Sequence, residues 1–273
     1  MCLIAFALDA HPDYALVLAA NRDEFYDRPT APAHFWDEEE GAEGLLAGRD
    51  ERAGGTWMGV TRAGRFAALT NVRDPSAERL SDAPSRGTLV TKILTDERPP
   101  AAVLDALAAD ANRYAGFNLL AGVFEADASP QLMYFSNRDG RPPRHVTPGV
   151  HGLSNASLDT AWPKVETAQA GLARLIEDGR AAPDPLLELL HDPAPAPDDA
   201  LPDTGVPREW ERALSSVFIQ TDGYGTRSAT ALLIGHGGDA TFVERTFEEG
   251  TPAGDRRFSF QIESAAGAVR ENE

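Results

Sequence analysis

Cys2 is the only cysteine of the 273-residue chain, and it directly follows Met1. Because cysteine is small, an aminopeptidase can remove the methionine before it, which would leave a thiol and a free α-amine on one residue. An α-amine has a pKa of roughly 7.7–8.0, so a large fraction is unprotonated near neutral pH. Such an amine can take the proton from its own side chain, as it does for a threonine nucleophile. The start of the chain therefore predicts a cysteine nucleophile for acyl transfer.

Acyl transfer also needs a group that orients the base and donors that stabilise an oxyanion. Asp23 can accept a hydrogen bond from the amine, and Arg22 can favour the thiolate because a nearby cation lowers a thiol pKa. Asn71 and Asn155 can donate hydrogen bonds to an oxyanion without carrying charge. Arg227, in a glycine-containing loop between two expected strands, can close the site from the other side.

Each of these residues also has an ordinary structural interpretation. A cysteine at this position can be a small buried hydrophobe. The arginine–aspartate pair can be a loop salt bridge, the two asparagines can be turn formers, and Arg227 can be a surface charge. A second Asn-Arg-Asp segment, Asn137–Asp139, is followed by Gly140 and predicts a plain turn.

Sequence patterns for a resident metal or phosphate ligand are missing. The six histidines have no metal-ligand spacing, and no Walker-type glycine-rich loop is present. A lone cysteine excludes internal disulfides and a multi-cysteine metal site. The residues themselves therefore predict no cofactor and no metal.

Several elements must position these candidate residues. Cys2–Leu8 and Ala15–Ala20 are apolar runs separated by a turn composition, which predicts a buried hairpin. Residues 21–33 are loop-like, with prolines at positions 29 and 32. The hairpin returns the chain beside its first strand, so the arginine–aspartate pair would lie near Cys2.

The remaining pattern places strands at both ends of the chain and helices in the middle. Helical apolar spacing is found in three segments: 88–94, 101–111 and from about 160 to 177. Residues 185–191 are a fourth candidate helix, and residues 217–220 and 229–235 are expected strands. This order is typical of an α+β fold with helices packed outside antiparallel sheets. We expect a single domain over residues 1–273, with a mobile Pro- and Asp-rich loop at about 191–207.

The composition describes the setting of the protein more than its function. The net charge is −18, and only Lys92 and Lys164 are lysines. An acidic excess with so little lysine is typical of a salt-in halophile, in which high salt screens self-repulsion. The alternative is arginine bias from a GC-rich genome.

DNA and RNA partners are not expected, because no basic patch outweighs the acidic field. No apolar run approaches the roughly 20 residues of a membrane span, so the expected location is the cytoplasm. The oligomeric state is open.

Several motifs in order resemble the NRDE family, also called the transport-and-Golgi-organisation protein 2 family. The resemblance runs from Met1 to about Phe247. The motifs are Met-Cys-Leu-Ile at the start, Ala-Asn-Arg-Asp-Glu at 20–24 with Arg28-Pro29, Gly-Gly-Thr-Trp-Met-Gly at 54–59, Ala-Leu-Thr-Asn-Val-Arg at 68–73, Gly-Leu-Ser-Asn at 152–155 and Tyr-Gly-Thr-Arg-Ser at 224–228.

This resemblance implies a fold similar to N-terminal nucleophile (Ntn) hydrolases, a four-layer αββα sandwich. Within that group it implies the branch of penicillin V acylase and bile salt hydrolase. Residues Cys2, Arg22, Asp23, Asn155 and Arg227 match the site of that branch, and Asn71 matches more loosely. Glu24 belongs to the NRDE pattern and not to the hydrolases. The implied partner is a small linear amide. The alternative implied by other family members is a haem-trafficking or acyl-CoA-binding protein on the same fold.

Overall fold

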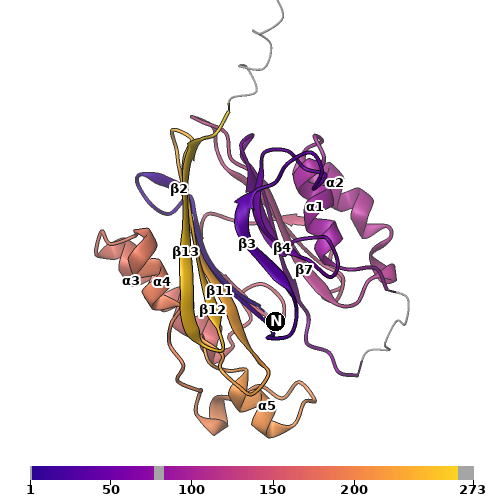
Figure 1. Ribbon diagram of the computed structural model, residues 1–273, viewed down its shortest axis with the longest axis vertical. Coiled ribbons are helices and arrows are strands. Elements are labelled where there is room, and N and C mark those ends of the chain that lie inside the picture. Colours follow the sequence, from indigo (N-terminus) through magenta and orange to yellow (C-terminus); the bar gives the residue numbers. More distant parts are fainter. Residues whose placement is uncertain (1, 77–82, 264–273) are drawn as a thin grey trace, which may run out of the picture.

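Two antiparallel β-sheets face each other and carry helices on their outer faces (Figure 1). The computed structural model describes residues 2–76 and 83–263. Met1, whose removal is predicted, lies outside the described residues. This layered arrangement confirms the predicted α+β fold, an αββα sandwich of antiparallel sheets.

The first sheet has six strands in the order β10-β1-β2-β11-β12-β13. Its strands are β10 (Gly149–Leu153), β1 (Cys2–Leu8), β2 (Tyr14–Phe25), β11 (Tyr224–Gly235), β12 (Asp239–Glu248) and β13 (Thr251–Gln261). Strand β2 lies at the centre because it pairs with β1 on one side and with β11 on the other. The sheet therefore joins the two ends of the chain at the predicted site.

The second sheet has seven strands that follow one another in sequence order from β3 to β9. Its strands are β3 (Thr30–Phe35), β4 (Leu45–Asp50), β5 (Met58–Thr61), β6 (Arg65–Asn71), β7 (Phe117–Val123), β8 (Gln131–Ser136) and β9 (Arg144–His145). Such an antiparallel meander needs only short connections, and the helices α1 and α2 are inserted between β6 and β7.

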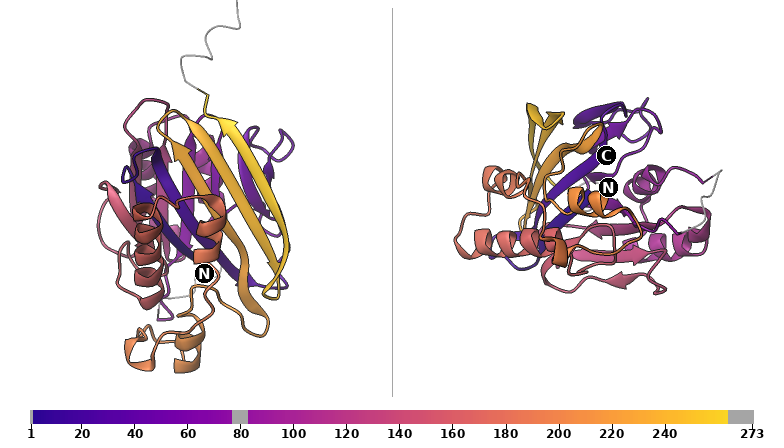
Figure 2. Two further views of the ribbon diagram at one scale, coloured as in Figure 1. Left: turned by 90° about the vertical axis from the view of Figure 1, so that its left-hand side faces the viewer. Right: turned by 90° about the horizontal axis from the view of Figure 1, so that it is seen from below.

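The helices cover the outer face of each sheet. Helices α3 (Pro163–Glu177) and α4 (Pro183–Leu189) cover the first sheet, as Figure 2 shows for the salmon-coloured pair. Helices α1 (Gly87–Thr95) and α2 (Pro100–Ala108) cover the second sheet, and α5 (Arg208–Ala213) lies at one end of the sandwich (Figure 1). Two short 3₁₀ turns span Ala111–Arg113 and Asp198–Ala200.

The apolar core is divided by the alternation of side chains along each strand. In β1, Ile4 and Phe6 pack in the cluster between the two sheets, whereas Leu3 and Ala5 pack in the cluster under α3 and α4. All of these side chains are fully buried. The uninterrupted apolar run therefore serves two different cores, one on each face of the strand.

Three expectations about local structure were wrong. Arg227 was expected in a loop between two strands but lies within β11. Residues 21–25 belong to β2 and residues 30–35 form β3, although residues 21–33 were expected to be a loop. The polar stretch remains a strand because β1 supplies backbone partners as far as Arg22 and β11 supplies them as far as Phe25. Residues 217–220 are not a strand apart from one isolated bridge between Gln220 and Gly225.

The Pro- and Asp-rich segment at 191–207 is anchored by several hydrogen bonds. The Ser215 hydroxyl accepts from the Ala196 N–H at 2.9 Å, and the Thr204 hydroxyl donates to Glu211 at 2.5 Å. Glu211 in turn pairs with Arg73 at 2.6 Å, and both side chains are almost fully buried. The mobility of this segment and the single-domain organisation stay predictions.

Candidate active site

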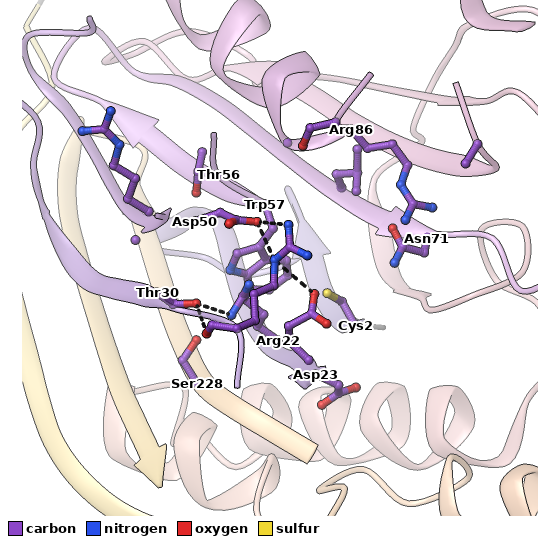
Figure 3. Close-up of a pocket in the computed structure, with 18 of the residues that line it drawn as sticks. Cys2, Arg22, Asp23, Thr30, Asp50, Thr56, Trp57, Asn71, Arg86 and Ser228 are labelled. Carbon is purple, nitrogen blue, oxygen red and sulfur yellow. Dashed lines mark hydrogen bonds and ion pairs between the residues drawn. The ribbon is translucent and has the colours of Figure 1, made fainter. Parts of the chain in front are cut away.

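A cleft of about 400 Å³ opens beside the start of β1 and the polar end of β2 (Figure 3). It lies between the two sheets, so residues of both contribute to its walls. Cys2, Arg22, Asp23 and Asn71 all line this cleft. The predicted nucleophile and the arginine–aspartate pair are therefore brought together by folding.

Cys2 and Arg22 are directly opposite each other in the antiparallel pair of β1 and β2. Opposite residues of such a pair point to the same face of the sheet, so both side chains face the cleft. The exposed fraction of Cys2 is 7%, and burial raises the pKa of its thiol. The guanidinium of Arg22 opposes that rise, while it also donates to the Thr30 hydroxyl at 3.1 Å.

Asp23 follows Arg22 in the strand and is directed toward the helical layer, because successive side chains alternate between the faces. Its carboxylate accepts a hydrogen bond from the Thr226 hydroxyl at 2.8 Å. Burial raises the pKa of Asp23, and the ammonium of Lys164 opposes this rise. Figure 3 shows the carboxyl group of Asp23 pointing away from Arg22. At the strand end it still borders the cleft.

Lys164, in the first turn of α3, is a residue that the sequence analysis did not assign to the site. Its exposed fraction is 2%, and its ammonium has no hydrogen-bond partner within residues 2–76 and 83–263. Burial lowers the pKa of Lys164 to about 8, while the charge of Asp23 opposes the decrease. The only signal in the sequence was the rarity of lysine in an arginine-rich chain.

The two asparagines predicted as oxyanion donors are linked to each other. The side-chain amide of Asn155 donates to the backbone carbonyl of Asn71 at 2.9 Å. Asn71 lines the cleft, whereas Asn155 is 1% exposed and lies behind it. The neighbouring Ser154 hydroxyl donates to the carbonyl of Cys2 at 2.9 Å, which ties this segment to the start of β1.

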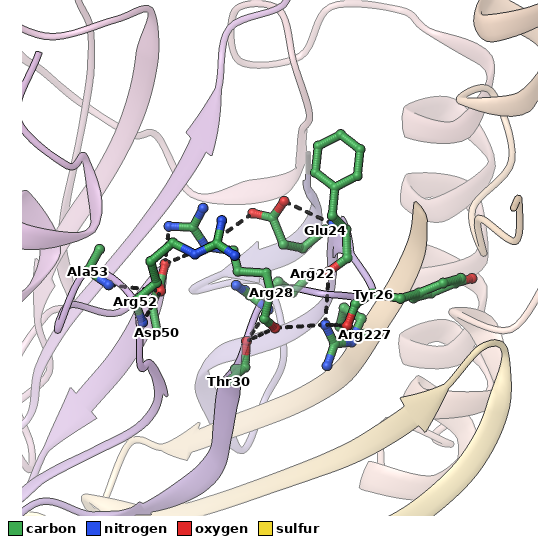
Figure 4. Close-up of polar contacts among 10 residues, drawn as sticks. Arg22, Glu24, Tyr26, Arg28, Thr30, Asp50, Arg52, Ala53 and Arg227 are labelled. Carbon is green, nitrogen blue, oxygen red and sulfur yellow. Dashed lines mark hydrogen bonds and ion pairs between the residues drawn. The ribbon is translucent and has the colours of Figure 1, made fainter. Parts of the chain in front are cut away.

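Arg227 is placed differently from the other candidate residues. It sits at a β-bulge of β11 and lines two neighbouring cavities with Glu248, not the cleft of Cys2, as far as the described residues show. Its guanidinium donates to the carbonyls of Phe25, Tyr26 and Arg28 at 2.9–3.1 Å (Figure 4). In this structure Arg227 holds the turn after β2 in place, and a direct role in chemistry stays a prediction.

Glu24 also lines the cleft, beside that same turn. Its carboxylate accepts the N–H of Phe25 at 2.9 Å and lies 3.9 Å from the guanidinium of Arg28. Arg28 reaches across to Asp50 of β4 at 2.6 Å (Figure 4). Through Arg28, Glu24 of the first sheet is thus linked to Asp50 of the second sheet at the rim of the cleft.

Two further charged residues of the cleft were absent from the sequence analysis. Arg86, the residue before α1, lines the wall formed by the second sheet and its helices. Glu244 of β12 is 4% exposed, and its carboxylate accepts the N–H of Ala33 at 2.6 Å. Burial raises the pKa of Glu244. Nothing in the local sequence patterns marked either residue.

Within the described part of the chain, no group of three or more histidine, cysteine, aspartate or glutamate side chains is placed to hold a metal ion. The same part contains no helix long and apolar enough to cross a membrane.

Comparison with known sequences matches residues 1–249 to the family model described as Transport and Golgi organisation 2. The Transport and Golgi organization protein 2 homolog of Bos taurus is 37% identical over 260 residues, which cover 90% of this chain and 93% of that protein. The Drosophila melanogaster protein of that name is 28% identical over 273 residues, covering 93% and 95%.

Among solved structures, similarity is found to the Caenorhabditis elegans ortholog of N-acylethanolamine-hydrolyzing acid amidase. The TM-score is 0.49 at 12% identity, covering 85% of this chain and 92% of that chain. A mutant of the conjugated bile acid hydrolase from Clostridium perfringens gives a TM-score of 0.41 at 9% identity, covering 95% and 92%. Similarity at this level says nothing about activity.

Proposed function

We propose that this chain, which belongs to the Transport and Golgi organisation 2 family as its motifs predicted, is a cysteine Ntn-type amidohydrolase that cleaves a linear C–N amide bond. The observation that carries the proposal is the position of Cys2 in a cleft, opposite Arg22 and beside Asp23. The cleft is large enough for a small molecule, and Cys2 is one of its lining residues.

The first step needs removal of Met1, which places the α-amine on Cys2 itself. The amine takes the thiol proton, and the thiolate attacks the amide carbonyl carbon to form a C–S bond. Processing matters for this step because burial alone raises the thiol pKa and disfavours the thiolate. Asp23 accepts a hydrogen bond from the amine, and Arg22 stabilises the negative sulfur.

The second step is collapse of the tetrahedral intermediate. The side-chain amide of Asn71, which lines the cleft, donates to the developing oxyanion. The C–N bond breaks, and the leaving amine takes the proton from the ammonium of Cys2. Water then gives a proton to the free α-amine and attacks the thioester carbon; the C–S bond breaks, the carboxylic acid leaves, and the ammonium returns its proton to the thiolate. Asn155 supports this arrangement through its hydrogen bond to the carbonyl of Asn71.

Intact mass spectrometry tests the proposal directly. The native protein should lack the mass of Met1 and should gain one acyl group from an activated ester such as 4-nitrophenyl acetate. Cys2→Ala should remove that labelling without loss of folding. Retained methionine together with an unreactive thiol would refute the proposal.

The rival prediction is a haem or acyl-thioester binding protein on the same fold. The cleft as described contains no histidine, so Cys2 is its one candidate for axial ligation of haem iron. Titration of the protein with haemin separates the two functions. A Soret shift at micromolar protein that disappears in Cys2→Ala, combined with an unreactive thiol, would favour the binding function.

A further inference from the structure

Arginines line the cleft on several sides, and most of them either pair with a carboxylate or face the thiol. Arg28 pairs with Asp50 at 2.6 Å, and Arg49 pairs with Glu40 at 2.7 Å. Arg22 faces the thiol from the opposite position on β2. Within residues 2–76 and 83–263, neither Arg22 nor Arg86 has a carboxylate at ion-pair distance, and of these two Arg86 lies on the side of the second sheet, away from β1 and β2.

The Arg86 guanidinium is held in position by a group that carries no charge. It donates to the backbone carbonyl of Gly116 at 2.8 Å, which fixes its direction but adds no negative charge. The side chain is half-buried, and burial lowers the pKa of Arg86. A partly desolvated cation with no counter-ion among the described residues costs folding free energy, which makes it a candidate for binding a negative group.

Arg86 lies across the cleft from the thiol. Cys2 comes from the first sheet, whereas Arg86 precedes α1 on the side of the second sheet. Figure 3 shows the Arg86 side chain extending toward the part of the cleft that contains Asn71. The first turn of α1 has no acidic side chain, and Asp50, which also lines the cleft, is paired with Arg28.

We propose that Arg86 binds a carboxylate of the substrate, so that the molecule cleaved by Cys2 carries a negative group on the side opposite the scissile amide. This inference rests on the proposed function. A guanidinium binds a carboxylate through two parallel hydrogen bonds. Arg22, which also has no carboxylate partner among the described residues, faces the thiol, so Arg86 is left to bind one negative charge. A phosphate monoester carries about −1.5 to −2 and needs more than one cation. Arg86 is then a specificity-determining residue.

The test compares two alkylating reagents of nearly equal size, iodoacetate and iodoacetamide. In both reactions the thiolate of Cys2 forms a bond to the methylene carbon and iodide leaves with the electrons of the C–I bond. The ratio of the two rates cancels the thiolate fraction, because both reagents need the same thiolate. We expect Arg86→Gln to lower the iodoacetate-to-iodoacetamide ratio about five-fold at constant ionic strength, since loss of one nearby cation weakens attraction of the anion.

Two variants control for simple damage to the cleft. Arg86→Lys keeps the positive charge and should retain most of the ratio. Arg49→Gln removes an arginine that lines the same cleft but is paired with Glu40, and it should leave the ratio unchanged. An unaltered ratio in folded Arg86→Gln would overturn the role of Arg86 while leaving Cys2 as the nucleophile.

A binding measurement separates this inference from the proposed function. Calorimetric titration of Cys2→Ala with glutarate and with uncharged glutaramide does not require a reactive thiol. Preference for glutarate that is lost in the additional Arg86→Gln variant supports the carboxylate site even if Cys2 proves unreactive. Equal binding of the two compounds, or a preference that survives Arg86→Gln, overturns it, and inorganic phosphate serves as the competing anion.

Discussion

The same three letters, Asn-Arg-Asp, occur twice in this chain and lie in two different environments. Residues 21–23 are inside β2, the central strand of the first sheet, and all three are buried. Residues 137–139 follow β8 in a turn, where the arginine is exposed. The sequence analysis predicted a turn for the second copy, and this was correct.

The asparagine side chains of both copies donate hydrogen bonds to backbone carbonyls. The Asn21 amide donates to the carbonyls of Leu190 and Val217 at 2.9 and 2.8 Å, which fastens the end of α4 and the segment before β11. Asn137 donates to the carbonyls of Ala111 and Tyr114 at 3.0 and 3.2 Å. Both amides replace missing backbone partners of irregular segments.

The arginine–aspartate pairs differ completely. Arg22 and Asp23 lie on opposite faces of a strand, one toward the cleft and the other beside Lys164. Arg138 donates to its neighbour's carbonyl at 3.0 Å, and Asp139 pairs with Arg144 at 2.8 Å near the surface. The same three residues therefore differ in burial and in charged neighbours, because different parts of the chain pack against them. Matched substitutions in the two copies can test this.

Replacing the asparagines should give the largest effect. Asn21→Ala leaves two buried carbonyls without a donor, and each costs about 1–3 kcal/mol, so we expect a loss of about 2–5 kcal/mol in the free energy of unfolding. Asn137→Ala should cost about 1–2 kcal/mol, because water can reach this half-buried site. Urea unfolding measures both. A larger loss of unfolding free energy in Asn137→Ala than in Asn21→Ala would contradict this prediction.

The cations beside the two aspartates should differ in their pH dependence. The pKa of Lys164 is lowered to about 8 in the folded protein, so the unfolded chain binds more protons between pH 8 and its ordinary value of 10.5. Stability therefore rises with pH across this window, by about 3 kcal/mol in total. Lys164→Met should lack this rise. Urea unfolding at pH 7 and pH 10 measures the difference in the free energy of unfolding between wild type and variant.

Arg144→Gln provides the matched control beside Asp139. Arginine stays protonated throughout this range, and the pair is partly exposed, so the stability difference should be below about 1 kcal/mol and independent of pH. If wild type and Lys164→Met differ in the free energy of unfolding by the same amount at both pH values, the folded-state pKa of Lys164 is not lowered.

The aspartates should differ in their effect on Cys2. Asp23→Asn removes the carboxylate that we propose orients the amine, and we expect acylation of Cys2 to slow by about 10- to 100-fold. Asp139→Asn should leave the rate unchanged, since Asp139 does not line the cleft. Stopped-flow release of 4-nitrophenol from 4-nitrophenyl acetate provides the rates, and equal rates in both variants would remove Asp23 from the mechanism.

The arginines should give the smallest difference. Arg22→Gln removes one cation beside the thiol, so the pH midpoint of Cys2 alkylation by iodoacetamide should rise by about 0.5–1 unit. Arg138→Gln should leave the midpoint unaltered, because Arg138 is exposed on another sheet. Equal midpoints in the two variants would mean that Arg22 does not act on the thiol.

Much of the architecture could be predicted because apolar periodicity reflects the layers directly. The strand at Cys2–Leu8 and the helices over residues 88–94 and 101–111 were expected near their observed places, α1 and α2. Polar residues 21–25 misled the prediction, because their strand is maintained by pairing with β11, and with β1 as far as Arg22, and not by apolar side chains. Such pairing with β11, about two hundred residues away, leaves no trace in a local pattern.

The sequence by itself determined the reactive residue types and their order, since only one cysteine exists and a characteristic polar segment follows the first hairpin. Only the tertiary structure decided which face each side chain occupies. It placed Arg227 against the turn after β2, Lys164 beside Asp23, and Arg86, which has no carboxylate partner among the described residues, across from the thiol. The physical reason is that charge and burial depend on what packs against a residue from other parts of the chain, and local spacing does not contain that information.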